Sequence, residues 1–298
     1  SLVKIHPSYW LSHQNLPPKK VNFQLIKKTN RLHLFKMTLS TQQATEIILE
    51  SFFTAPPLIS DLPEAQHFQP SDLSPPVKPT PLNFSQKLGH LYEDALAQIF
   101  TSSKDYDLLE RNLQIQKDIH TTVGELDFLL RNLKTHQLIH LELATKFYLA
   151  VGSDLPGPDT RDTYFKKLTH LREHQLQLPR NFQAHLPADY RNENIITQQL
   201  IYGCLFDHIE APEPSTPEFL NPKCRRGKWL HLTDLPIHFP ADQEFQIIPK
   251  PLWPVPLELL TKATLESWEP PHTLERCTMV RVPSDLNPYF ITPAKYPD

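Results

Sequence analysis

The sequence of 298 residues contains little glycine, cysteine or methionine, with 6, 3 and 2 residues respectively. Three cysteines without CxxC spacing provide neither a disulfide framework nor a cysteine-rich zinc site, and they indicate free thiols in a reducing compartment. No apolar run approaches the roughly 18 residues that a membrane-spanning helix needs, and the N-terminus lacks the apolar stretch of a signal peptide. We therefore expect a cytoplasmic protein that contacts no membrane.

A basic excess is also missing, because the formal net charge is −3, and this excludes a global basic surface for nucleic acid but not a local one. Proline, in contrast, is abundant at 31 residues and crowds 55–81 and 249–256, whereas every glycine lies between 89 and 227. This distribution predicts a compact core with proline-rich flanks. The expected parts are an N-terminal extension or upstream sequence (1–36), an N-terminal segment with a proline-rich linker (37–84), the core (85–210) and a C-terminal extension packed on it (211–298).

The periodicity of the core predicts an α/β fold. An apolar stripe over 88–99 indicates a helix, and three strand-like stretches follow it before a second helix and a further strand. The expected order is therefore α-β-β-β-α-β, with the first three strands locally antiparallel. The predicted strands are 106–116, 123–131, 137–150 and 195–206, and the second helix is 159–178.

Acidic side chains share faces on two neighbouring predicted strands. Side chains alternate along a strand, so Asp127 lies opposite the apolar face of its strand, and Glu142 and Lys146 share one face of the next strand. If the apolar faces pack together, these three residues converge. Two carboxylates suit Mg²⁺ or Mn²⁺, and a lysine beside them can orient a water and offset charge on a phosphate. The alternative is that these polar faces are the solvated side of an amphipathic hairpin.

Three stretches carry a resemblance to a known family: GELDFLLRN (124–132), HLELATKFYL (140–149) and GPDTRDTYFKKLTHLREHQLQL (157–178). Together with LGHLYE (88–93), they resemble the bacterial family catalogued as domain of unknown function 1853, within the PD-(D/E)XK nuclease superfamily. The resemblance implies a restriction-endonuclease-like core of αβββαβ order, with proline-rich N- and C-terminal extensions. The strong part of the match covers residues 88–178.

The resemblance also implies roles for single residues. Asp127 and Glu142 would be metal ligands for Mg²⁺ or Mn²⁺, and Glu93 on the first helix would be an auxiliary acid that holds a metal-bound water. Lys146 would take the role of the motif lysine. The motif places that lysine two residues after the acid, where this sequence has Ala144, so Lys146 lies about 6.6 Å further along the strand.

The second predicted helix adds candidate nucleic-acid-binding residues. Lys167, His174 and Gln175 are placed to line the cleft, in a stretch with a modest basic excess. The favoured function is metal-dependent cleavage of DNA or RNA. The alternatives are a module of the same fold that binds nucleic acid or a protein without cutting it, and a hydrolase of another phosphate ester. A lysine amine that points away from the carboxylates would favour the binding module.

Overall fold

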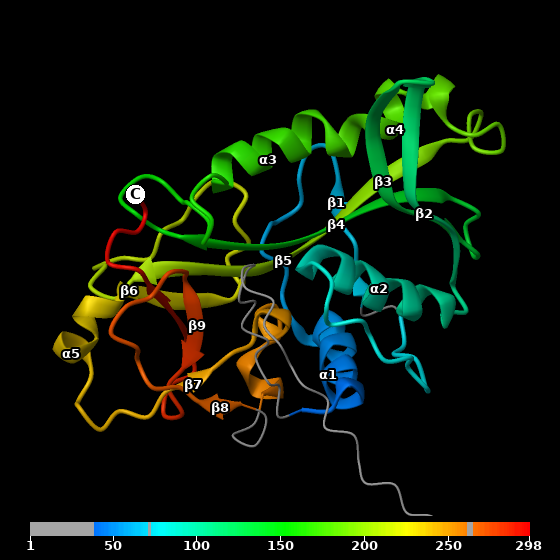
Figure 1. The fold of residues 1–298 in the computed structure, drawn as a ribbon. Coiled ribbons are helices and arrows are strands. Elements are labelled where there is room, and N and C mark those ends of the chain that lie inside the picture. The colour runs from blue at the N-terminus through cyan, green and yellow to red at the C-terminus, as the bar shows by residue number, and fades with distance from the viewer. Residues whose placement is uncertain (1–38, 71–72, 261–264) are drawn as a thin grey trace, which may run out of the picture. The chain divides into compact units, whose positions relative to one another are not determined.

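The computed structural model describes residues 39–70, 73–260 and 265–298, which belong to one compact unit, Lys36–Asp298. The predicted extension at residues 1–36 therefore lies outside the described residues. A mixed α/β fold is confirmed, because helices cover a sheet of ten strands (Figure 1). None of the helices in the described ranges is long and apolar enough to cross a membrane.

The strands form one sheet that joins the predicted core to the C-terminal part of the chain. Its order is β2-β3-β4-β5-β6-β10-β9-β7-β8, with β1 paired to β5 beside this path. Strands β4, β5, β6 and β10 run parallel, whereas β2-β3-β4 and β10-β9-β7-β8 are antiparallel. The strands are β1 (Gln66–His67), β2 (Tyr106–Asp118), β3 (Thr121–Asn132), β4 (Leu138–Leu149), β5 (Ile195–His208), β6 (Arg226–His231), β7 (Gln246–Ile247), β8 (Glu266–Ser267), β9 (Thr278–Arg281) and β10 (Pro288–Thr292).

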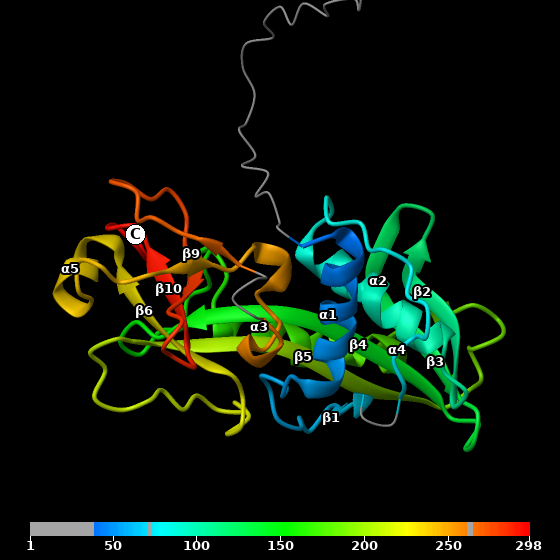
Figure 2. The same ribbon diagram turned by 90° about the horizontal axis from the view of Figure 1, so that it is seen from below.

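The helices lie on both faces of the sheet. In Figures 1 and 2, α1 and α2 lie side by side on one face of β4 and β5, and α3 lies on the other. The predicted second helix, 159–178, is shorter than expected, because α3 ends at Glu173 and a 3-10 turn, η2, carries the chain onward. The α-helices are α1 (Thr41–Thr54), α2 (Leu88–Thr101), α3 (Tyr164–Glu173), α4 (Leu178–Asn181) and α5 (Leu235–His238). The 3-10 helices are η2 (Gln175–Gln177), η3 (Gln183–His185), η4 (Leu232–Asp234), η5 (Lys250–Leu252) and η6 (Leu257–Leu259).

Strand β4 divides its side chains between two cores, as its alternation requires. Leu141, Leu143 and Phe147 join the large core under α1 and α2, whereas Ala144 and Tyr148 join the smaller core under α3. The acidic side of β4 therefore faces α3 and is covered by it. The apolar packing that the sequence predicted between the second and third strands of the core is present in the structure.

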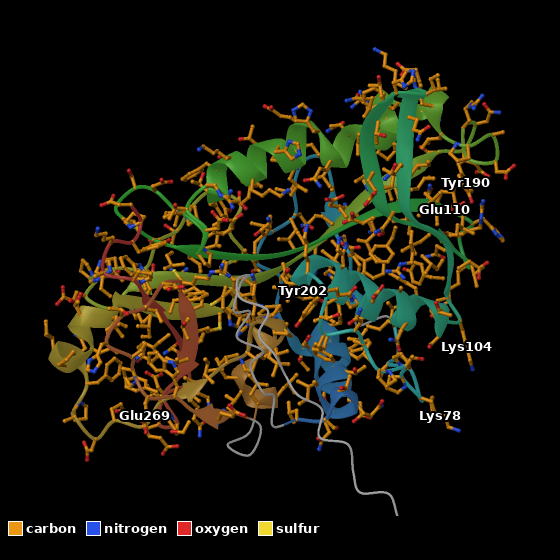
Figure 3. All side chains as sticks on the ribbon, in the orientation of Figure 1. Lys78, Lys104, Glu110, Tyr190, Tyr202 and Glu269 are labelled. Carbon is orange, nitrogen blue, oxygen red and sulfur yellow. The ribbon has the colours of Figure 1, made fainter. Side chains whose placement is uncertain are left out.

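The proline-rich segments are packed parts of the fold. Residues 55–65 run beside β5, where Leu58 donates its backbone N–H to Ile201, and Leu58 and Ile59 are buried under α3. On the other face, the Tyr202 hydroxyl donates a hydrogen bond to the carbonyl of Phe52 at the end of α1 (Figure 3). The start of this linker is thus tied to β5 from both faces of the sheet.

A glycine lets β4 and β5 approach closely beside the acidic face. Gly203 is the register partner of Lys146 and has a φ of +155°. A Cβ atom built there would lie 1.6 Å from the backbone oxygen of Lys146. Because a backbone oxygen cannot move aside as a side chain can, only glycine fits this position without a shift of the strand.

Candidate functional site

The two predicted carboxylates are neighbours on adjacent strands. The β3–β4 ladder ends at the pair Phe128–Leu141, and Asp127 and Glu142 are the next residues on each strand. Beyond this pair the backbone N–H of Leu143 donates to Asp127 Oδ2 at 2.9 Å, so the carboxylate takes the place of a ladder partner. The end of the ladder therefore orients Asp127 beside Glu142.

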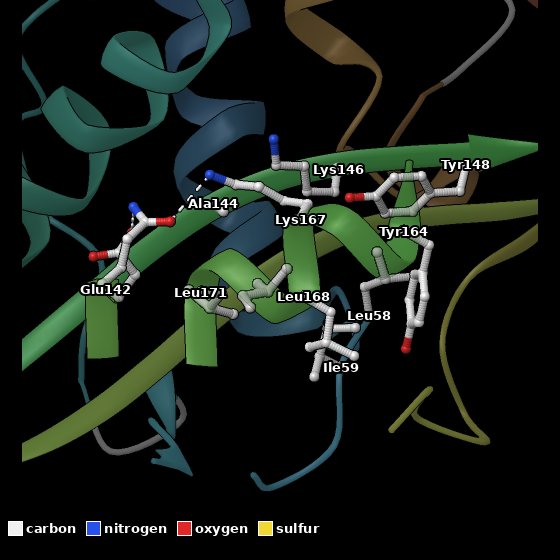
Figure 4. A pocket seen from close by; sticks show the side chains of 12 residues that line it. Leu58, Ile59, Glu142, Ala144, Lys146, Tyr148, Tyr164, Lys167, Leu168 and Leu171 are labelled. Carbon is white, nitrogen blue, oxygen red and sulfur yellow. Dashed lines mark hydrogen bonds between the residues drawn. The ribbon is translucent and has the colours of Figure 1, made fainter. Parts of the chain in front are cut away.

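Glu142 is buried under α3, with 2% of its surface exposed, so the solvated-hairpin alternative does not describe it. Its Oε1 accepts a hydrogen bond from Gln175 Nε2 on η2, whereas its buried Oε2 has no hydrogen-bond partner. Gln175 Oε1 in turn accepts a hydrogen bond of 3.0 Å from Lys167 Nζ on α3 (Figure 4). A relay of three side chains thus ties the α3 ammonium group to the carboxylate.

Burial raises the pKa values of both carboxyl groups. Desolvation raises the pKa of Asp127 to about 8, and the negative charges of Glu142 and Glu93 add to this rise. Desolvation likewise raises the pKa of Glu142 to about 8, although the nearby Lys167 ammonium opposes the change. Both acids therefore retain protons near neutral pH, and a cation that replaces those protons would relieve the cost of their burial.

A buried histidine lies beside the pair on β4. His140 is fully buried and its Nε2 lies 3.7 Å from Glu142 Oε2, which is too long for a hydrogen bond. Desolvation lowers the pKa of His140 to about 4, so the imidazole is neutral at pH 7 and forms no ion pair with Glu142. Neither of its ring nitrogens has a partner.

Glu93 approaches the pair from α2. Its Oε2 accepts a hydrogen bond from Asn112 Nδ2 on β2 at 3.1 Å and lies 3.2 Å from His90 Nδ1. Its negative charge raises the pKa of both Asp127 and Glu142, so it lies within electrostatic range of the pair. The predicted auxiliary acid is therefore near the pair, and Asn112 holds it there.

Lys146, the predicted catalytic lysine, points elsewhere. Its Nζ lies 3.2 Å from Asp162 Oδ2 in the loop before α3, in a part-buried ion pair. Periodicity placed Lys146 on the correct face of β4, but the loop carboxylate holds its amine away from Glu142. The ammonium group linked to the pair belongs to Lys167.

The remaining helix candidates divide between the pocket and the surface. Lys167 and Gln175 line a pocket between β4, β5 and α3 whose walls include Ala144 and Lys146 (Figure 4). Ala144 leaves space there that a longer side chain would fill. His174 is exposed and stacks against His170, with ring centroids 5.1 Å apart, so it is not part of this pocket.

Sequence reasoning missed Asn112, which has a left-handed φ of 51° opposite Asp127 at a break in the β2–β3 ladder. Asparagine tolerates this conformation better than most residues, but its position was hidden inside a predicted strand. It also missed Asp162, whose contact with Lys146 depends on tertiary packing. No local pattern in the sequence indicates either role.

The donor set of the pair suits a magnesium-type ion in its chemistry. Hard divalent cations prefer carboxylate oxygens, and Mg²⁺ is commonly held by one or two carboxylates together with water and substrate phosphates. Asp127 and the unpartnered Oε2 of Glu142 meet that minimum. Within the described ranges, no group of three or more His, Cys, Asp or Glu side chains is arranged to hold a metal ion.

Comparison with known proteins identifies the family. No curated protein and no solved structure matches the chain. A family model described as Domain of unknown function (DUF1853) matches residues 30–286, which includes the acid pair and nearly all of the sheet. The chain therefore belongs to this family.

Proposed function

We propose that the protein hydrolyses phosphodiester bonds of DNA or RNA with Mg²⁺ or Mn²⁺. The observation that carries this proposal is the pair of part-buried Asp127 and buried Glu142, which has one unpartnered carboxylate oxygen and a lysine ammonium group tied to it through Gln175. Two carboxylates with a nearby ammonium group form the minimal set for metal-assisted attack of water on a phosphate.

Each residue has a separate task in this proposal. Asp127 and Glu142 hold the ion, which when bound polarises the phosphate and supplies an activated water. The Leu143 N–H and the Gln175 amide fix the two carboxylates in place, and they also use one acceptor site on each. Lys167 offsets negative charge that develops on the phosphate, and Glu93 is placed to accept a hydrogen bond from a bound water.

The arrangement of elements supports placing the family in the PD-(D/E)XK superfamily, which we also propose. The order α2-β2-β3-β4-α3-β5 follows the expected αβββαβ, and the acids lie on β3 and β4. The lysine differs from the motif, because Ala144 occupies its position and Lys167 on α3 supplies the ammonium group. In this proposal the helix takes over a task that the strand performs in the motif.

A second candidate function is favoured by one specific contact. The ion pair of Lys146 with Asp162 turns the strand lysine away from the acids, as expected for a module that binds nucleic acid without cutting it. The two candidates differ in whether Lys167 replaces Lys146.

A comparison of lysine variants tests the proposal. Purified protein is incubated with single- and double-stranded DNA and RNA, with Mn²⁺, Mg²⁺ or chelator. We expect cleavage only with the metal ions, and we expect Lys167→Met to reduce the rate by about 10²-fold because a charge-stabilising group is lost. Lys146→Met is the matched control, and we expect a change of less than about tenfold.

Two outcomes would contradict the nuclease proposal. Nucleic acid that binds but is never cleaved under any metal condition would establish the binding module. Cleavage that depends on Lys146 and is indifferent to Lys167 would refute the assignment of the lysine and would require Lys146 to leave Asp162 during the reaction.

A further inference from the structure

The acid pair belongs to a row of polar side chains that crosses several strands. Glu142 on β4 and Gln199 on β5 are register partners, and Gln199 is also the partner of His67 on β1. Register partners in a parallel pair lie about 4.8 Å apart and project their side chains to the same face. Asp127 extends the row on the other side of Glu142.

Unpartnered buried atoms gather around this row. In the described part of the chain, the buried side-chain nitrogen and oxygen atoms without a hydrogen-bond partner lie at or beside the row, with the exception of Arg225 Nη2. These atoms are His67 Nδ1, Asn112 Oδ1, His140 Nδ1 and Nε2, Glu142 Oε2 and Gln199 Oε1. Because buried polar atoms are nearly always satisfied in folded proteins, such a concentration points to a ligand or to water that belongs there.

Gln199 is held in a fixed orientation. Its side chain is fully buried, and its Nε2 donates a hydrogen bond of 3.0 Å to the carbonyl of Ser60 in the segment that runs along β5. The bond to Ser60 uses the amino end of the amide, so the oxygen end is left without a partner beside Glu142. A buried oxygen in this state has lost its water without gaining a hydrogen bond, which destabilises the fold unless a ligand satisfies it.

The charge of the site is compatible with a neutral third oxygen. Two carboxylates already balance the charge of a divalent cation, so a third ligand need not carry charge. An amide oxygen adds a hard ligand without adding charge.

From these observations we infer that Gln199 Oε1 is a third oxygen ligand of the divalent cation held by Asp127 and Glu142. The inference rests on the metal ion of the proposed function and adds a ligand from β5. Gln199 thereby links the cation to the segment around Ser60, so ion binding also stabilises the packing of the proline-rich linker against the sheet.

The test measures Mn²⁺ binding in the absence of nucleic acid, by titration calorimetry of the full chain. Gln199→Met removes the oxygen at similar volume, and we expect at least about a tenfold loss of affinity. Gln199→Glu keeps an oxygen at that position, and we expect Mn²⁺ affinity at least equal to that of the wild type, with a larger rise of melting temperature on Mn²⁺ addition. Gln198→Met is the matched control, because Gln198 is on the same strand but projects to the opposite face, and we expect no change.

Each outcome decides the inference. A wild-type affinity in Gln199→Met, or an equal loss in Gln198→Met, would overturn it. If Gln199→Met does not fold, a Gln199→Glu variant that folds but binds Mn²⁺ at least tenfold more weakly than wild type would overturn it instead. Mn²⁺ binding that depends on Asp127 but not on Gln199 would contradict only the assignment of Gln199 as a ligand and would leave the proposed function standing. Mn²⁺ binding that depends on Gln199, in a protein that never cleaves nucleic acid, would contradict the nuclease proposal but support the assignment of Gln199 as a ligand.

Discussion

Asp127→Asn and Glu142→Gln should each reduce metal-dependent cleavage by at least about 10³-fold. Each change keeps the shape of the side chain but removes one of the two negative charges that would hold the ion, and the activated water is lost with the ion. The measurement is single-turnover cleavage of the best substrate at saturating Mn²⁺. Neither variant should unfold near neutral pH, because each amide has the shape and the neutral charge of the protonated acid that it replaces in the metal-free protein.

Glu110→Gln provides the control for this comparison. Glu110 also lies in the sheet, on β2 opposite Leu129, but its carboxylate accepts a hydrogen bond from the Tyr190 hydroxyl at 3.0 Å (Figure 3). We expect Glu110→Gln to cleave the substrate at the wild-type rate. Full activity in Asp127→Asn would refute the site, and equal losses in all three variants would indicate a general loss of structure.

The free energy of unfolding in chelator should fall as the pH rises from 6.5 to 8. In the folded state Asp127 and Glu142 have pKa values of about 8, compared with ordinary values of 3.8 and 4.5, so the folded protein holds protons that the unfolded chain has released. Stability is therefore lost as the pH rises toward 8, at roughly 1.4 kcal/mol per pH unit for each group that keeps its proton. The expected fall is on the order of 3 kcal/mol, because both groups keep their protons at pH 6.5 and begin to lose them near pH 8.

The protonation of His140 affects the free energy of unfolding only at lower pH. Its folded pKa of about 4 lies below the ordinary value of 6.5, so the contribution of its burial is lost as the pH falls from 6.5 toward 4. The range from 6.5 to 8 thus isolates the carboxyl groups.

Urea unfolding of the wild type and of Asp127→Asn at pH 6.5, 7.2 and 8 measures this effect. The variant has one buried acid fewer, and its Glu142 no longer faces a second negative charge. We therefore expect its slope to be about half that of the wild type, and we expect it to be the more stable protein at pH 8. Equal slopes in the two proteins would mean that the pair does not titrate in this range.

The strands of the core could be predicted because their signals are local. Alternation over twelve residues of β4 placed Glu142 on one face and Leu141 on the other, and the structure has both there. The same alternation could not show that Asp162 holds Lys146, because that contact depends on how the loop before α3 folds back onto the sheet. The position of Gln199 beside Glu142 could not be predicted either, because the parallel register joins two residues that are 57 positions apart in the chain.

The C-terminal part of the sheet was missed for a related reason. Strands β7 and β8 have two residues each, which is too short for a periodic signal. The pairing of β6 with β10 joins Lys228 to Tyr289 across an intervening segment rich in proline. Helix α1 was also missed. Ser40 and Gln43 form a capping box at its start, and this pattern can be recognised in the sequence.

Proton release on Mn²⁺ binding tests the central claim most directly, namely that the pair Asp127–Glu142 is a divalent-cation site. Calorimetric titrations at pH 7 in buffers of different ionisation enthalpy count the protons released when the ion binds. Because both carboxyl groups have pKa values of about 8 in the metal-free protein, we expect about one proton or more per Mn²⁺ ion, and fewer in Asp127→Asn. A binding heat that is the same in every buffer, or Mn²⁺ binding that is unchanged in Asp127→Asn, would contradict the claim.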